Sequence, residues 1–137
     1  MKTRITALAL SLVLFFQGES RALTPEERQA IEYEIQVSDK LSEFLSDLFD
    51  KFSEGYVEPD EALKKLSVYR NEFDLSVNPP QKDGERLFEL MHQFLSYIEN
   101  YFIYFKRTQR ENPEINIEIY KLKVDIKKEV IRLNHLL

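Results

Sequence analysis

The chain has 137 residues, of which 43% are hydrophobic and 31% charged, and this composition predicts one folded domain rather than a disordered chain. It contains no cysteine, which excludes disulfides, thiolate metal sites and cysteine nucleophiles. The net charge is −5, and three glycines and five prolines leave room for few turns, so we expect a few long elements.

The N-terminus has the three parts of a secretory signal peptide. Lys2 and Arg4 provide the positive end, and residues 5–16 form an uncharged, largely apolar run. Small residues precede a cut after Ala22. The apolar run is shorter than the roughly 20 residues that a membrane span needs, so we predict a cleaved signal rather than an anchor.

Residues 1–22 are therefore predicted to be removed, leaving residues 23–137 as a single domain in the periplasm or outside the cell. The removed segment holds three basic residues and one acidic residue, so the remainder has 16 basic and 23 acidic residues and a net charge of −7. Such acidity argues against nucleic acid and anionic lipid as partners. We expect no membrane span in the mature chain.

A first helix is predicted over residues 25–53. Thr24 can cap it, Pro25 suits its first position, and Glu27 completes a capping box. Gly55 follows its end, as a C′ glycine does. One side of this helix carries a row of carboxylates, which we interpret as a solvated face rather than a cation site: Glu32, Asp39, Glu43, Asp47, Asp50 and Glu54.

The start of this helix, LTPEE at residues 23–27, resembles the LTxxQ box of the Spy and CpxP family of small helical periplasmic chaperones and metal-stress proteins. Glu27 stands where that motif has glutamine, and the chain has no second copy of the motif. The resemblance implies a helical fold and a chaperone or metal-stress role. No functional residue is carried over from it.

A second helix is predicted over residues 59–75, forming an antiparallel hairpin with the first. Residues 76–82, which include two consecutive prolines, form a non-helical connector with polyproline character. Asp83 is the expected cap of a third helix over residues 84–110. Within it, residues 87–105 are apolar or aromatic over more than half of the circumference, so this helix should have neighbours on several sides.

A fourth helix is predicted over residues 113–136, with Asn112 as its cap. The expected fold is therefore an all-α, up-and-down bundle of four helices, the second of them short. Two alignments of the helices along the bundle are possible. In the favoured one, the connector stretches and the three long helices align. In the other, residues 101–110 and the start of the fourth helix project past the first hairpin with apolar groups on both sides, and they require a partner or a second copy.

The fourth helix carries a second apolar row, opposite its core-facing one. Ile117, Val124 and Ile131 are spaced by seven residues, with Tyr120 beside them. Ile103 on the third helix also points away from its own apolar face. Because this outer row exceeds ordinary scatter of exposed apolar residues, we predict that these five residues bind a partner.

No catalytic, metal or cofactor site is predicted. Glu89 and His92 match the Glu-x-x-His spacing of di-iron bundles, but the chain has only one such pair, and both residues are expected to face solvent. We therefore expect a non-enzymatic, exported protein that acts through protein–protein interaction, with a homodimer as one form. The alternatives are a carrier of an apolar ligand or lipid between aromatic helix faces, and a Spy-like chaperone.

Overall fold

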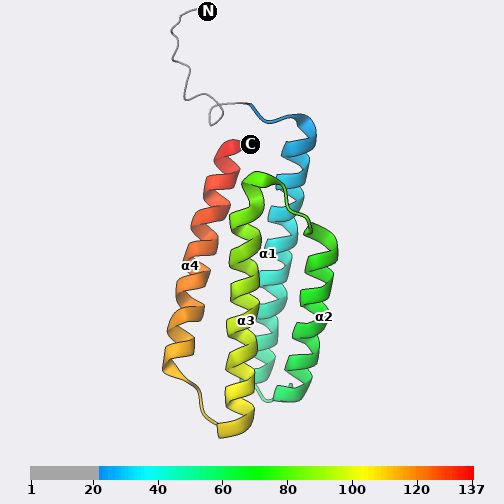
Figure 1. Cartoon of the computed structure of the whole chain (residues 1–137). Helices are drawn as coiled ribbons and strands as arrows, with labels where there is room; N and C mark the ends of the chain where they lie inside the picture. Colours follow the sequence, from blue (N-terminus) through cyan, green and yellow to red (C-terminus); the bar gives the residue numbers. More distant parts are fainter. Residues whose placement is uncertain (1–21) are drawn as a thin grey trace, which may run out of the picture.

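A computed structural model describes residues 22–137 and shows a bundle of four helices that run alternately in opposite directions (Figure 1). The predicted all-α fold is confirmed. The predicted signal peptide lies, apart from Ala22, outside the described residues. No helix of the described part is long and apolar enough to cross a membrane. The helices are α1 (Pro25–Ser53), α2 (Pro59–Val77), α3 (Glu85–Thr108) and α4 (Pro113–Leu136), with a short 3-10 turn, η2 (Lys82–Gly84), before α3.

The predicted helix starts are confirmed at α1 and α4. Thr24 Oγ1 accepts a hydrogen bond from the Glu27 amide at 3.1 Å, and Glu27 Oε1 accepts one from the Thr24 amide at 2.8 Å. These two bonds form the predicted capping box. Asn112 Oδ1 accepts from the first amides of α4. After α1, Gly55 has a φ of 85°, which glycine adopts without strain.

At the α2–α3 connection the structure differs by one or two residues from the approximate bounds predicted, 59–75 and 84–110. Helix α2 continues to Val77 rather than ending at residue 75, because Val77 extends the buried stripe of this helix. Asp83 does not cap α3. It lies inside η2, where its amide donates to Gln81 Oε1 at 2.6 Å, and Gly84 occupies the N-cap position without a side-chain bond.

The end of α3 also differs from the prediction. The helix ends at Thr108 rather than at residue 110, because Gln109 turns into the left-handed conformation with a φ of 59°. The Arg110 amide then donates to Thr108 Oγ1 at 3.1 Å.

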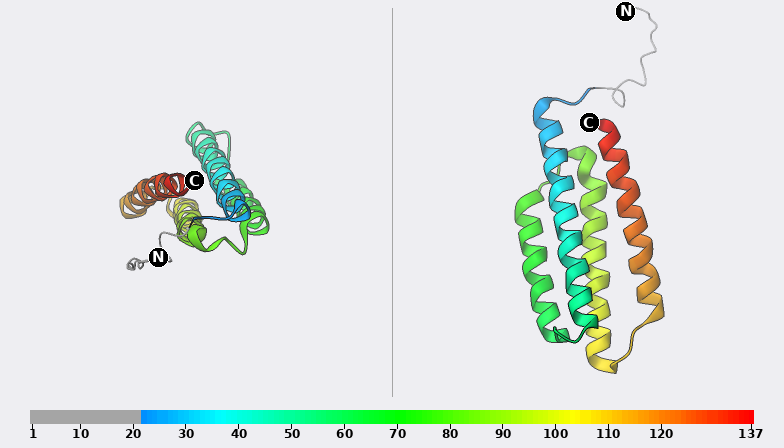
Figure 2. Two further views of the ribbon diagram at one scale, coloured as in Figure 1. Left: turned by 90° about the horizontal axis from the view of Figure 1, so that it is seen from above. Right: turned by 180° about the vertical axis from the view of Figure 1, so that it is seen from behind.

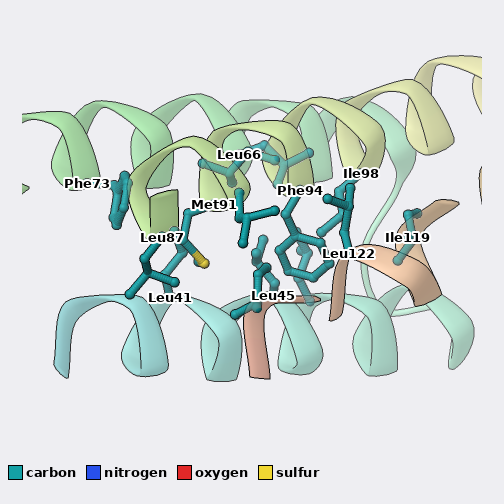
Figure 3. Close-up of a cluster of buried hydrophobic side chains, with 14 of the residues drawn as sticks. Leu41, Leu45, Leu66, Phe73, Leu87, Met91, Phe94, Ile98, Ile119 and Leu122 are labelled. Atoms are coloured by element: carbon teal, nitrogen blue, oxygen red, sulfur yellow. The ribbon is translucent and has the colours of Figure 1, made fainter. Parts of the chain in front are cut away.

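The core lies along α3, as the apolar width of this helix predicts. Leu87, Met91 and Ile98 are completely buried between the other helices (Figure 3). Leu41 and Leu45 approach from α1, and further buried side chains come from α2 and α4: Ala62, Leu66, Phe73, Ile119, Leu122, Ile126 and Leu133.

The last turns of α3 settle the register of the bundle. Phe102 is completely buried, and its ring lies 5.4 Å from Phe49 and 5.0 Å from Phe52 of α1. Tyr101 packs edge-on against Phe49 at 5.1 Å. The end of α1 thus covers these aromatic turns, as the aligned register requires, and this end of the bundle is self-contained.

The four sides of the bundle are not equally closed. The backbones approach closely between α1 and α2, α2 and α3, and α3 and α4. Viewed along the helices, α4 lies beside α3 and stands apart from α1 (Figure 2). The side between α1 and α4 is therefore the open side of the bundle.

Candidate interaction site

A groove of about 680 Å³ runs along the open side, between α1 and α4. Its floor is apolar. Phe94 of α3 lies at the bottom, Leu45 and Phe49 line the α1 wall, and Ile126 and Val130 line the α4 wall. Leu45, Phe94 and Ile126 are buried beneath the groove, Phe49 and Val130 are half-buried along its walls, and Ile131 is the exposed apolar residue of its lining.

Two small residues keep the groove open. The α1 wall presents Ser42 and Ser46 toward α4, at positions where larger apolar side chains would fill the space between the helices. On the opposite side, α1 packs against α2 with larger residues, including Phe44, whose ring stacks on Tyr69 at 5.5 Å. The shape of the groove therefore follows from the sequence of α1.

The two walls carry opposite charges. Asp39 and Asp50 stand on α1, and Lys123 and Lys127 stand on α4. Partial burial, together with the nearby Glu43 carboxylate, raises the pKa of Asp39. The groove therefore combines an apolar floor with an acidic rim and a basic rim.

The structure places the predicted partner-binding residues in two locations. Ile131 lines the groove and is 57% exposed. Tyr120 is 68% exposed and lies about 20° from Ile131 around α4, at 100° per residue. Ile117, 53% exposed, and the half-buried Val124 continue this apolar surface over the outer face of α4.

Ile103 is not part of this surface. It is 37% exposed, but it follows Phe94 by nine positions and so lies about 180° around α3 from the floor of the groove. The outer row of α4 therefore lies beside the groove, whereas Ile103 lies on the far side of α3.

A buried carboxyl lies between α1 and α4, closer to the start of α1. Glu34 is 1% exposed, and neither of its oxygens has a hydrogen-bond partner within residues 22–137. The same is true of Ser38 Oγ, one turn later. Burial, and secondly the charge of Glu129, raise the pKa of Glu34 to about 7. Glu34 is therefore largely protonated in mildly acidic solution.

Gly84 makes this arrangement possible. A Cβ at position 84 would overlap Glu34 Oε1 and come within 2.9 Å of its Cδ. On α4, Arg132 bonds Glu129 through two nitrogens, at 3.0 and 2.6 Å, and donates to the Asp83 carbonyl at 2.9 Å. These contacts tie α1, η2 and α4 together beside the groove.

Sequence reasoning missed this buried cluster, although a signal was present. Glu34 and Ser38 occupy core-facing positions in the same stripe as Ile31 and Leu41, and Glu129 lies between Ile126 and Leu133 in the inner stripe of α4. A polar residue at such a position must be buried, and buried polar groups are uncommon. No pattern in the sequence around Gly84 indicates that this residue lies against Glu34.

His92 is better anchored than predicted. Its Nε2 lies 2.6 Å from Asp74 Oδ1 of α2, and its ring packs against Phe88 at 4.7 Å. The side chain is therefore half-buried between α2 and α3 rather than free in solvent, whereas Glu89 is exposed as expected. Within residues 22–137, no three His, Cys, Asp or Glu side chains are grouped closely enough to hold a metal ion.

A second groove, of about 560 Å³, lies between α1 and α2 and is lined by Tyr33, Phe44 and Tyr69. It is the place where a carried apolar ligand would meet aromatic side chains. Both grooves are open to solvent, while the aromatic cluster of Phe49 and Phe102 is packed ring against ring.

Comparison with protein-family models, curated proteins and solved structures finds no match to this chain.

Proposed function

We propose that this chain is an exported, non-catalytic interaction module that binds a protein through the α1–α4 groove and the neighbouring outer row of α4. The observation that carries the proposal is the row of exposed apolar side chains on α4, Ile117, Tyr120 and Ile131, beside a groove between two helices whose backbones do not approach closely. A contiguous apolar surface of this kind, bordered by charged side chains, suits a protein partner.

The outer row extends the contact surface beyond the groove. Tyr120 and Ile131 are each more than half exposed, and both lie on the side of α4 that turns toward the groove. Complete burial of such side chains stabilises a contact by about 1–2 kcal/mol each. Together with the half-buried Phe49 and Val130, they form an apolar surface flanked by charged side chains, which is the usual anatomy of a protein interface.

Export and lack of catalysis are supported by the sequence. The positive N-terminus and its short apolar run are typical of a secretory signal, and the cysteine-free composition needs no oxidative folding. Of the two histidines, His92 is engaged with Asp74 of a neighbouring helix.

Replacement of Ile131 by glutamate tests the contact in its simplest form, a homodimer. The wild-type chain of residues 23–137 is expected to show a concentration-dependent dimer by light scattering. The Ile131→Glu chain should dissociate at least about tenfold more readily, because the dimer would bury an unpaired charge.

Leu75→Glu is the matched control, because Leu75 is an exposed apolar residue, 86% accessible, on α2 rather than at the groove. It should leave the dimer unchanged. A wild-type chain that stays monomeric at every concentration would remove the homodimer.

A further inference from the structure

The charged rims of the groove have no partners within one chain. Asp39, Asp50, Lys123 and Lys127 line the groove, and Glu43 stands one turn beyond Asp39 outside its lining. None of these five side chains forms an ion pair within 4 Å in the part of the chain that the structure describes. The carboxylates all stand on α1 and the two lysines on α4. Each wall therefore offers charge of one sign, and the two walls are complementary to each other.

Two identical faces of this kind can meet about a two-fold axis in either of two directions. If the axis runs across the helices, α4 meets the α4 of the other copy and lysines face lysines. If the axis runs along the helices, each α4 lies on the α1 of the other copy and lysines face carboxylates. Like-charge repulsion disfavours the first direction.

The positions of the charges along the helices agree with the second direction. Helices α1 and α4 are antiparallel, and the Arg28 side chain reaches the carbonyl of Leu137. At about 1.5 Å per residue, Asp39 lies roughly 16 Å along α1 from Arg28, and Lys127 lies roughly 15 Å along α4 from Leu137. The two residues therefore lie at the same height.

The next turn repeats this match. Glu43 lies roughly 22 Å from Arg28 and Lys123 roughly 21 Å from Leu137. An axis parallel to the helices leaves every height unchanged, so each lysine of one copy would face the carboxylate at its own level in the other. Tyr120 would likewise face Ser46, a small residue that leaves room for its ring.

We infer that the α1–α4 face packs against the same face of a second copy of this chain, related by an axis parallel to the helices. In this dimer Lys127 and Lys123 of each copy pair with Asp39 and Glu43 of the other. The inference rests on the proposed function, because it names the partner and orientation at the same groove.

Reciprocal charge reversal tests this arrangement. One chain carries Lys123→Glu with Lys127→Glu, and a second carries Asp39→Lys with Glu43→Lys. Each variant alone should have a dimer dissociation constant raised on the order of tenfold or more, because both contacts become repulsive. An equimolar mixture should regain association, since every reversed charge then meets its opposite.

The control reverses charges on α2, with Lys64→Glu in one chain and Glu61→Lys in the other, and should leave association unchanged. A wild-type dimer that Ile131→Glu weakens but the charge reversals leave intact would overturn this orientation and keep the proposed contact. A mixture that remains monomeric would overturn it equally. A monomeric wild-type chain would instead overturn the homodimer itself.

Discussion

Gly84→Ala is expected to destabilise the fold by about 2 kcal/mol, within the range of an overpacked core. The backbone at Gly84 has a φ of −91° and a ψ of 0°, which alanine adopts freely, so the cost arises from contact rather than from backbone strain. The added methyl group would overlap the buried Glu34 carboxyl. Urea unfolding followed by circular dichroism measures the change.

Truncation of Glu34 separates this contact from other causes. In a Glu34→Ala background the space beside position 84 is free, so Gly84→Ala should then cost little. A double-mutant cycle therefore predicts strong coupling between the two positions. Equal costs of Gly84→Ala in both backgrounds would show that the glycine is required for another reason.

The stability of the fold is expected to fall as the pH rises from about 4.5 to about 7. Glu34 has a pKa near 4.5 when unfolded and about 7 in the fold, so the folded chain holds the additional proton over this interval. The contribution of this proton to the free energy of unfolding is complete below pH 4.5 and is lost once the pH has passed 7. The total loss is about 3 kcal/mol.

Glu34→Gln should remove this pH dependence, because the amide does not ionise. Above pH 7 the variant should be more stable than the wild type, by up to about 3 kcal/mol, and near pH 4 the two should converge. Glu32→Gln, at an exposed position of the same helix, is the control and should follow the wild type. A wild-type stability that is flat from pH 5 to pH 8 would contradict the burial of an unpaired carboxyl.

The fold was largely predictable because its signals are local. Thr24, Pro25 and Asn112 define helix starts through capping chemistry that needs no tertiary information. The errors fall where packing decides. Val77 extends α2 because it is buried, and the N-cap of α3 falls at Gly84, where a side chain would overlap Glu34.

The candidate site was predictable only in part. The seven-residue spacing of Ile117, Val124 and Ile131 indicated an apolar row on the outer face of α4, and the structure leaves Ile117 and Ile131 exposed and Val124 half-buried. The groove beside it depends on how far α4 stands from α1. In the sequence, Ser42 and Ser46 are ordinary helix residues, and only the position of α4 shows that they line a groove. The sequence also could not show that Ile103 lies away from the outer row of α4, because this depends on the position of α3.

Chemical cross-linking between two cysteine variants tests most directly whether the α1–α4 face binds a second copy. Because the natural chain has no cysteine, Lys127→Cys in one chain and Asp39→Cys in another provide single reactive thiols. With a short bis-maleimide, the mixture should yield a cross-linked dimer containing one chain of each kind. Cross-linking no faster than in a control mixture of Leu75→Cys with Asp39→Cys would contradict the proposed contact.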